Sequence, residues 1–370
     1  MTKRKIINDP VYDGFLSIDD PVILQVIEHP YFQRQRRIKQ LGLTYLVYPG
    51  AMHTRFSHML GALNLMKRAL ETLKLKGVEI TDEECRGAKL AILLHDLGHG
   101  PFSHTSERVL VDVPHEEITL LMMQRINEEM HGALDMAIAI FSNTYHKHFL
   151  HQLVSSQLDM DRLDYLGRDS FFTGVSEGIV GTDRIISMLN VHDDELVIDE
   201  KGIYSVEKFI ISRRLMYWQV YMHKTVIAAD QLLLSILRKA RDLNVSPFTF
   251  HLSPFDLDRF AEVDDDDIMV AVKHWQHSDD EILSTLCKNM VNRRLPAIRF
   301  SNEPFTGVHT SYFEGTGKLA NRSYDFNDKE IKVLYKDGRC LPISEASDQL
   351  DRHFLEKQVT KYYHYFPKES

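Results

Sequence analysis

The sequence predicts a mainly α-helical protein, with a helical core followed by a smaller region of mixed α and β structure. Apolar residues recur at helical spacing through most of the first 245 residues, whereas aromatic residues, glycines and β-prone segments mix beyond Glu303. The chain has 370 residues, 44% of them hydrophobic, which is long enough for two domains. We therefore expect a core over residues 1–245 and a C-terminal α+β region over residues 246–370.

The first elements are expected to be mostly helices. Pro30 divides residues 20–42 into two helices, because proline interrupts helical hydrogen bonding. Residues 43–50 are β-prone and end in a turn. A helical pattern then runs over residues 53–75 without an internal proline. Thr81, followed by three carboxylates, predicts the N-terminus of the next helix, which runs to His95.

The later elements are shorter and more varied. Residues 133–169 predict two helices, and residues 206–243 predict one long helix. Between them, residues 195–199 and 203–206 flank a turn and predict a β-hairpin. After Pro247 the expected elements are helices near 255–260 and 267–273 and a β-strand near 331–335.

Composition excludes several classes of protein. A net charge of −9 gives no general attraction to nucleic acids or anionic membranes. The cysteines are far apart and form no CxxC motif, which argues against a disulfide framework and against a cysteine zinc site; they are Cys85, Cys287 and Cys340. The basic start lacks an apolar signal region, and no run of 18 apolar residues occurs, so we expect no membrane span and a cytoplasmic location.

The pair His95-Asp96, at the end of an apolar run, is the most informative motif. An imidazole and a carboxylate are both costly to bury without partners, and a divalent metal would satisfy both. A helix that simply ends at a glycine explains this pair alone about as well. Histidines before the pair, at 53 and 58, and after it, at 99 and 104, together with the carboxylate-rich segment 159–169, make a common ligand the better interpretation.

These residues resemble the HD-domain metal phosphohydrolases. Within them, the chain is most similar to the deoxynucleoside triphosphate triphosphohydrolases that in animals carry a sterile-alpha-motif domain, although no such domain is recognised in this sequence. The likeness runs from Lys5 to about Ala240. Its strongest blocks are His53-X-Arg55-Phe56-X-His58, the run from His95 to His104, and the run from Asp159 to Asp169.

The resemblance implies a helical HD-domain core that holds one divalent metal. Its ligands would be His58, His95, Asp96 and Asp161, a set that suits manganese, iron, zinc, nickel or magnesium without distinguishing among them. The metal would polarise the phosphorus centre and acidify water.

The resemblance also implies a set of catalytic side chains around the phosphates. His115 would be the general acid, with Glu116 orienting it, and His99 and His104 would lie beside the phosphates. Without the resemblance, His115 would be read only as the first residue of a helix after Pro114.

Contacts to the nucleotide are implied for eight residues: Gln40, Leu41, Arg55, Arg162, Tyr165, Asp169, Arg213 and Tyr221. The arginines among them would hold phosphate oxygens, whose geometry suits guanidinium. Tyr165 would pack under the sugar and exclude a 2′-hydroxyl group.

An activator site is implied more distantly. Lys5, Gln33 and Arg36 match positions that in relatives bind a guanine nucleotide between subunits, with Glu28 in place of an aspartate. Such a site implies a homo-oligomer, either a dimer or a tetramer.

The expected activity is metal-dependent hydrolysis of deoxynucleoside triphosphates, including dGTP, to deoxynucleoside and tripolyphosphate. Two alternatives stay open at the level of sequence. One is an HD phosphohydrolase that acts on another nucleotide or phosphoester. The other is a nucleotide-sensing binding protein without turnover. A nucleic-acid scaffold is disfavoured by the net charge of −9.

Overall fold

The computed structural model describes residues 4–12, 14–111, 113–248, 256–322, 324–326 and 330–368. Within helices and strands, four side chains are also outside the description: those of His104, Ser106, Arg108 and Arg322. His104 is one of the expected catalytic histidines, so its side chain cannot be placed in the site. Phe255, expected to lie at a helix start, is likewise outside the described residues.

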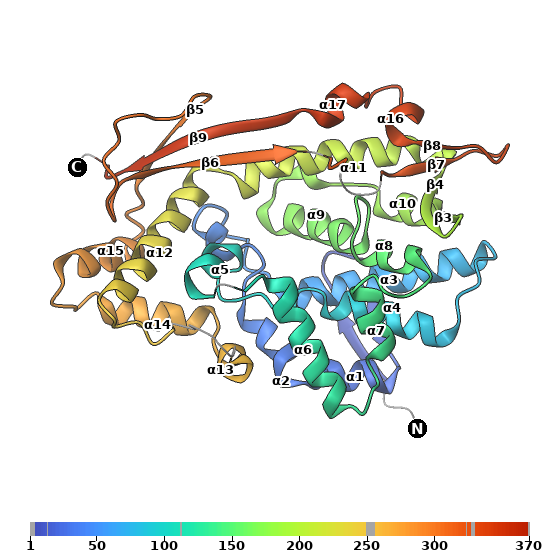
Figure 1. The fold of residues 1–370 in the computed structure, drawn as a ribbon, viewed down its shortest axis with the longest axis horizontal. Helices are drawn as coiled ribbons and strands as arrows, with labels where there is room; N and C mark the ends of the chain where they lie inside the picture. The colour runs from blue at the N-terminus through green and yellow to red at the C-terminus, as the bar shows by residue number, and fades with distance from the viewer. Residues whose placement is uncertain are drawn as a thin grey trace.

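The first half of the chain is a bundle of helices built around α3. Its helices are α1 (Pro21–Glu28), α2 (Pro30–Arg34), α3 (Arg55–Leu75), α4 (Asp82–Leu94), α5 (His104–Leu110), α6 (His115–Glu129), α7 (Asp135–Phe141), α8 (His148–Val154) and α9 (Met160–Thr173). Helix α3 packs against both α4 and α9, and α4 also packs against α7 (Figure 1). This packing brings the ends of three helices to one place, where the site lies.

The second half continues the bundle and then changes character. Its helices are α10 (Thr182–Met188), α11 (Ile203–Met216), α12 (Lys224–Asp242), α13 (Leu257–Glu262), α14 (Asp265–Trp275), α15 (Glu281–Val291), α16 (Ile343–Ala346) and α17 (Arg352–Glu356). Short 3-10 or π turns connect several elements: η1 (Gln35–Arg37), η2 (Gly42–Leu46), η3 (Ser176–Gly178), η4 (Glu200–Gly202) and η5 (Tyr217–Tyr221).

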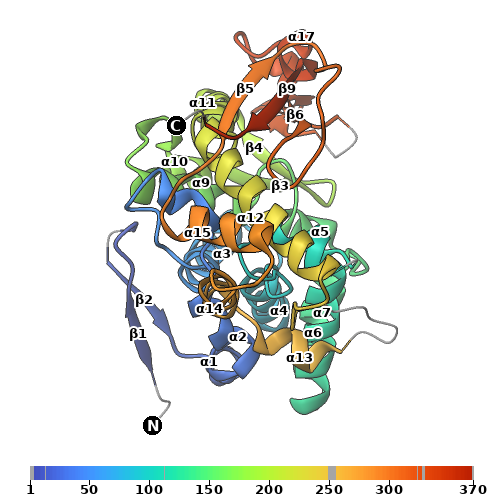
Figure 2. The ribbon, with the colours of Figure 1, turned by 90° about the vertical axis from the view of Figure 1, so that its left-hand side faces the viewer.

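Three small sheets lie at the margins of the bundle. The strands are β1 (Lys5–Asn8), β2 (Phe15–Ile18), β3 (Leu189–His192), β4 (Glu195–Asp199), β5 (Ala297–Ser301), β6 (Gly315–Arg322), β7 (Lys332–Leu334), β8 (Cys340–Pro342) and β9 (Gln358–Phe366). Strands β1 and β2 form a hairpin along one edge of the molecule, and β5, β9 and β6 form an antiparallel sheet beside α12 (Figure 2). The third sheet has the order β3-β4-β7-β8, with β4 and β7 parallel.

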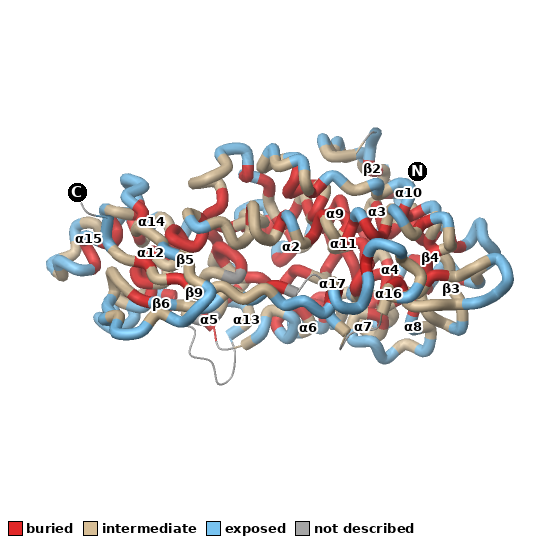
Figure 3. Tube along the Cα trace, turned by 90° about the horizontal axis from the view of Figure 1, so that it is seen from above, coloured by how far each residue is buried: buried red, intermediate tan, exposed pale blue. Residues whose placement is uncertain are grey.

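The hydrophobic core runs through the middle of the bundle. Buried residues concentrate on α3, α4, α9 and α11, whereas the outer helices and connecting turns are exposed on one side (Figure 3). The apolar end of α4 is fully enclosed from Leu90 to Leu94. No helix in the described part of the chain is both long and apolar enough to cross a membrane.

The expected fold class, mainly helical with small sheets towards the C-terminus, is confirmed. Pro30 does separate two helices, as expected. Helix α4 begins with a reciprocal capping box, in which Thr81 accepts the Glu84 N–H at 3.1 Å and Glu84 accepts the Thr81 N–H at 2.8 Å. The division of the chain at residue 245 stays a prediction.

Residues 43–50 do not form the expected β-structure. The chain there makes the 3-10 turn η2, whose first residue, Gly42, has a φ of +50°. Leu43 and Thr44 are buried. The apolar residues that suggested a strand instead anchor a tight turn against the core, because burial and not local β-propensity decides the outcome.

The expected hairpin of residues 195–199 with 203–206 is also wrong. Strand β4 pairs with β3 on its N-terminal side, through a two-residue turn at Asp193 and Asp194 with φ of +50° and +61°. Aspartate tolerates this left-handed conformation better than most residues, which favours a tight hairpin there. Residues 203–206 begin α11 instead.

Two helical segments are more divided than expected. Residues 133–169 contain α7, α8 and the start of α9, three helices where two were expected. The expected long helix over residues 206–243 is interrupted by the π turn η5 between α11 and α12. The apolar periodicity continues across such breaks, so it does not mark them.

Gly98 allows a close approach between the loop after α4 and helix α6. A Cβ atom at this position would lie 2.2 Å from the carbonyl oxygen of His115 and 2.4 Å from the backbone nitrogen of Thr119. The Gly98 N–H donates to the Thr119 hydroxyl at 2.9 Å, and that hydroxyl donates to the His95 carbonyl at 3.3 Å. Gly98 therefore joins the segment that carries His95 to the helix that begins with His115.

We expect Gly98→Ala to lower the free energy of unfolding by about 1–3 kcal/mol, because backbone atoms would have to move to relieve the overlap. Gly167→Ala is the matched control, since a Cβ there meets no described heavy atom within 4 Å. The control should be neutral or stabilising by up to about 1 kcal/mol. Urea unfolding curves measure both, and equal midpoints for the two variants would contradict the prediction.

Candidate metal centre and active site

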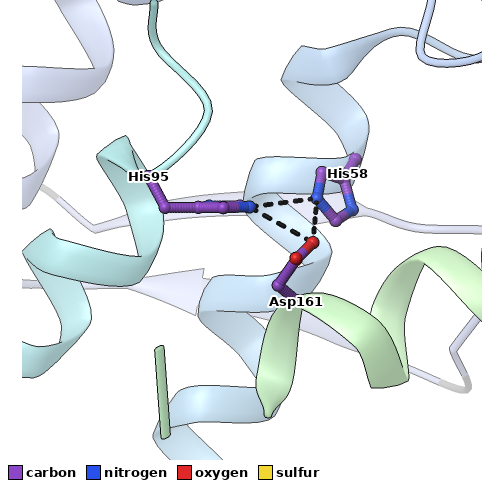
Figure 4. A group of neighbouring side chains, drawn as sticks. All are labelled: His58, His95 and Asp161. Atoms are coloured by element: carbon purple, nitrogen blue, oxygen red, sulfur yellow. Dashed lines mark hydrogen bonds and ion pairs between the residues drawn. The ribbon is translucent and has the colours of Figure 1, made fainter. Parts of the chain in front are cut away.

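Three potential metal ligands from three helices meet at one point. His58 lies on α3, His95 follows the last residue of α4, and Asp161 lies in the first turn of α9 (Figure 4). The Nε2 atoms of His58 and His95 lie 3.0 and 3.2 Å from Oδ1 of Asp161 and 3.4 Å from each other. Atoms that share one ion at about 2.1 Å are separated by about 3.4 Å in tetrahedral geometry and by about 3.0 Å in octahedral geometry. The three side chains thus have the spacing that a divalent ion requires.

The two imidazole rings are oriented so that each directs Nε2 towards this point. Nδ1 of His58 donates to Oδ2 of Asp164 at 2.7 Å, and Nδ1 of His95 donates to the carbonyl oxygen of Ile92 at 2.7 Å. Because both partners accept, Nδ1 of each ring carries a hydrogen, and Nε2 is the atom that faces the shared point. An outer carboxylate or carbonyl that holds a histidine in this way is typical of metal sites.

The electrostatics of the cluster also favour a cation. Although burial lowers the pKa of His58, its hydrogen bonds to Asp161 and Asp164 raise that pKa to about 10. Burial likewise opposes ionisation of Asp161, but His95 and His58 hold its pKa below the usual value. The site therefore stabilises a positive charge between two imidazoles and a carboxylate. Nitrogen and oxygen donors of this kind suit first-row divalent metals.

Asp96, the fourth expected ligand, lies against the cluster but is also engaged elsewhere. Its oxygens are 3.6 Å from Nε2 of His58, 3.5 Å from Nε2 of His95 and 3.4 Å from Nε2 of His99. It also forms an ion pair with Arg55. Burial opposes ionisation of Asp96, but Arg55 and His95 hold its pKa well below the usual value.

Arg55 is turned towards the metal centre. Its side chain is buried, pairs with Asp96, and donates to the Ser103 hydroxyl at 3.0 Å. Arg55 thus orients one expected metal ligand, and its phosphate contact stays a prediction.

A second cluster lies beside the first and contains His115. The rings of His115 and His99 are stacked, with centroids 3.9 Å apart and an interplanar angle of 20°. Nδ1 of His115 is 2.6 Å from Glu107, and Nε2 is 3.3 Å from Glu116. Burial and the nearby Arg55 hold the pKa of His99 well below its usual value, so His99 is neutral.

Glu107 was not identified from the sequence. It contacts Nδ1 of His115 more closely than Glu116 contacts Nε2. The contact joins α5 to α6 across eight residues, and no local motif marks it. Only the packing of these two helices shows that Glu107 holds the ring.

Four of the expected nucleotide contacts are linked to each other through His53. Asp169 accepts from Nε2 of His53 at 2.7 Å and from the Tyr221 hydroxyl at 2.7 Å. Tyr221 meets Tyr165 edge to face, with centroids 6.2 Å apart. The Gln40 N–H donates to the His53 carbonyl, and its side-chain oxygen is buried with no hydrogen-bond partner among the described residues. Leu41, another of the expected nucleotide contacts, is not part of this group and is partly buried against the core.

The two remaining arginines contact the loop that precedes α9. Arg162 donates to the Ser156 carbonyl at 2.6 Å and pairs with Asp159 at 3.2 Å. Arg213, on α11, contacts the side chain of Gln157 at 3.3 Å. Burial and the charge of Arg162 lower the pKa of Arg213. Two guanidinium groups thus lie close together beside Tyr165.

The residues expected at an activator site form two local pairs. Lys5 on β1 lies 3.7 Å from Glu28 on α1, and Nε of Arg36 donates to Gln33 at 2.9 Å. The Arg36 guanidinium also stacks on the Phe56 ring. Lys5 and Glu28 line a cavity of about 320 Å³ with Leu24.

The chain matches two protein-family models. Residues 55–169 match the HD domain and residues 180–302 match the HD associated region. The match to the HD domain begins at Arg55 and ends at Asp169. It therefore contains His115 and the four expected metal ligands, which are His58, His95, Asp96 and Asp161.

Curated relatives are similar over different lengths. The uncharacterized protein YwfO of Bacillus subtilis is 32% identical, over 100% of this chain and 93% of the relative. The deoxynucleoside triphosphate triphosphohydrolase SAMHD1 homolog of Dictyostelium discoideum is 33% identical over 60% of this chain and 46% of the relative. The human SAMHD1 triphosphohydrolase is 29% identical over 64% of this chain. The chain therefore spans under half the length of the relatives whose names state an activity.

Solved structures are similar over the whole chain. A phosphohydrolase from Bacteroides thetaiotaomicron is 47% identical, with a TM-score of 0.94 over 99% of this chain and 100% of that chain. A hypothetical protein from Aquifex aeolicus is 29% identical, with a TM-score of 0.79 over 98% of this chain and 96% of that chain.

We expect Asp164→Asn to weaken binding of a divalent metal by about 10- to 100-fold, because the neutral amide no longer holds the Nδ1–H of His58 as strongly. Asp9→Asn is the control, since Asp9 pairs with Arg168 and does not touch His58. Calorimetric titration of Mn²⁺ into metal-free protein measures both affinities. A folded Asp164→Asn variant that binds Mn²⁺ as tightly as the wild type would contradict the prediction.

Proposed function

Because this chain belongs to the HD-domain phosphohydrolase family, we propose that it hydrolyses deoxynucleoside triphosphates to deoxynucleoside and tripolyphosphate. The observation that carries the proposal is the meeting of His58, His95 and Asp161, whose donor atoms lie 3.0–3.4 Å apart beside a stacked pair of histidines. The names of the triphosphohydrolase relatives from Dictyostelium and human support the choice of substrate.

In this proposal one divalent metal is held by His58, His95, Asp96 and Asp161, with Asp164 fixing the His58 ring. The donor set fits such an ion, because both imidazoles present Nε2 and both carboxylates are ionised. When bound, the metal supplies a polarised phosphate oxygen and an acidified water.

His115 is proposed to donate a proton to the departing 5′-oxygen of the nucleoside. Glu107 holds Nδ1 of the ring at 2.6 Å, which fixes the orientation of the imidazole. His99 stacks on the same ring and is kept neutral, so it restrains the ring without adding a second positive charge. Glu107 therefore takes the orienting role that the sequence assigned to Glu116.

Nucleotide binding is proposed for the polar group around His53 and for the two arginines beside Tyr165. Gln40 offers a buried amide oxygen with no partner among the described residues, which suits a sugar hydroxyl donor. Tyr165 and Tyr221 present ring edges and faces that a deoxyribose can pack against. Arg162 and Arg213 supply positive charge for phosphate oxygens.

A nucleotide activator between subunits of a dimer or tetramer is a further part of the proposal. Lys5, Glu28, Gln33 and Arg36 would contribute to it, and the Lys5–Glu28 pair lines a cavity of about 320 Å³ that a nucleobase could enter.

The experiment that tests the function is a panel of all deoxy- and ribonucleoside triphosphates, each alone and in pairs, incubated with Mn²⁺. The expected products are deoxynucleoside and tripolyphosphate, separated by ion-exchange chromatography. Release of orthophosphate or pyrophosphate would assign a different phosphohydrolase reaction. Tight nucleotide binding without any product would identify a nucleotide-sensing protein.

We expect Tyr165→Ala to lower the preference for deoxyribonucleotides over ribonucleotides by about 10-fold or more, because the ring that excludes a 2′-hydroxyl is removed. Tyr165→Phe keeps the ring and should keep the preference. The ratio of kcat/KM for dGTP and GTP measures the effect. An unchanged ratio in Tyr165→Ala would assign the discrimination to other residues.

We expect His115→Ala to lower kcat by roughly 100- to 10,000-fold while metal content stays constant, because a general acid acts mainly in the transition state. Glu107→Gln should lower kcat less, because the ring loses its orienting partner but the proton donor remains. Metal content, melting temperature and kcat are measured on one preparation of each variant. A His115→Ala variant with a lowered melting temperature but normal kcat would show that His115 only begins α6.

A further inference from the structure

A large cavity lies beside the C-terminal half of α9. It has a volume of about 730 Å³ and lies between the β1–β2 hairpin, α3, the C-terminal half of α9 and the start of α10. Figure 2 shows the hairpin along the edge of the molecule that borders it. None of the four proposed metal ligands is among its described lining residues, so the cavity is separate from the site above.

Gly167 keeps this cavity open. It lies in the interior of α9, where glycine costs about 1 kcal/mol relative to alanine. A Cβ atom there would meet no described heavy atom within 4 Å, so no close packing requires a glycine. Gly167 lines the cavity. Gly167 therefore leaves room at the cavity wall that a larger side chain would occupy.

The charges on the cavity wall neutralise each other. Arg68 pairs with Asp183 at 2.6 Å, and Asp9 pairs with Arg168 at 2.6 Å. These pairs include every charged side chain that is described on the wall. A phosphate group would therefore find no uncompensated cation there, which favours an uncharged ligand.

The rest of the wall suits a flat ligand with polar edges. Tyr12, Phe15 and Phe171 line it with aromatic rings, and Phe15 and Phe171 are 70% and 55% exposed. The Asn64 side chain also lines it and has no hydrogen bond to any described residue. An amide offers a donor and an acceptor side by side, the pattern that matches the edge of a nucleobase.

The wall of the cavity is connected to the metal centre by two hydrogen bonds. The Tyr12 hydroxyl donates to Oδ1 of Asp164 at 2.7 Å, and Oδ2 of the same carboxylate accepts from Nδ1 of His58 at 2.7 Å. Asp164 is fully buried. A ligand that packs against Tyr12 therefore acts on the group that orients a proposed metal ligand.

We propose that this cavity is a second ligand site that takes an uncharged nucleoside, and that Tyr12 couples its occupancy to metal binding at His58. The class of ligand follows from the cavity wall. The choice of deoxynucleosides as probes rests on the proposed function, whose products they are.

Isothermal titration of the metal-loaded full chain with deoxyadenosine, deoxyguanosine, deoxycytidine and thymidine tests the site. A nucleoside can also bind at the active site as a product, so binding to the wild type alone does not identify the cavity. Two variants at Gly167 distinguish the two sites. Gly167→Leu projects a branched side chain into the cavity and should remove one binding site per chain, or weaken it at least about tenfold. Gly167→Ala also replaces the helix-interior glycine, but its methyl group leaves most of the cavity volume free. This variant should bind nucleosides as the wild type does.

The coupling is tested by titrating Mn²⁺ into metal-free protein with and without a saturating nucleoside. The expected change in Mn²⁺ affinity is about fivefold or more, with a reciprocal change in nucleoside affinity. Tyr12→Phe should abolish the change and leave nucleoside affinity within about twofold. Equal Mn²⁺ affinities in the wild type with and without nucleoside would overturn the coupling.

The remaining outcomes separate this proposal from the proposed function. Nucleoside binding that Gly167→Leu abolishes, in a protein that hydrolyses no triphosphate, supports the cavity and overturns the activity. Hydrolysis with nucleoside binding that Gly167→Leu leaves unchanged overturns the cavity alone. Tighter binding of a triphosphate than of its nucleoside at the Gly167-dependent site overturns the uncharged class. If no nucleoside binds and Phe171→Ser changes the sedimentation coefficient, the cavity rim is a subunit interface and the proposal fails.

Discussion

The buried carboxylate of Asp164 is the group on which the arrangement of the site depends. It accepts hydrogen bonds from His58, Tyr12 and Arg168, and although burial opposes ionisation, Arg168 and His58 lower its pKa to about 2. A buried charge that loses its partners destabilises a protein by about 3–5 kcal/mol, so these contacts are held together. Through them the N-terminal hairpin, α3 and α9 are fixed in one relative position.

The space for this carboxylate comes from a glycine on the facing helix. A Cβ at Gly61 would lie 2.0 Å from Oδ1 of Asp164 and 2.1 Å from a terminal nitrogen of Arg168. Gly61 therefore lets α9 approach α3 closely enough for Asp164 to reach His58. Asp161, one turn earlier on α9, is brought to the other nitrogen of the same ring. One close helix contact thus sets two of the donor positions at the metal centre.

The loop after α4 serves two neighbouring clusters at once. His95 follows the enclosed apolar end of α4, and its Nδ1 donates to the Ile92 carbonyl of that helix. Asp96 then stands between the metal donors and His99, while Gly98 brings α6 and His115 against the loop. The stacked histidines are neighbours of the metal donors because this short loop carries residues of both clusters.

The sequence alone determined the helical class, the separation of two helices at Pro30 and the start of α4 at Thr81, because proline and capping residues are local signals. The family resemblance pointed to His58, His95 and Asp161, whose side chains the structure brings together. The sequence did not reveal that Glu107 holds His115 or that Asp164 holds His58, since these contacts join separate helices. It also predicted a strand at residues 43–50 and a second hairpin strand at 203–206, where the chain forms η2 and begins α11. Tertiary packing decided all of these, because burial of apolar side chains outweighs local propensity and because buried polar groups find their partners only when helices meet.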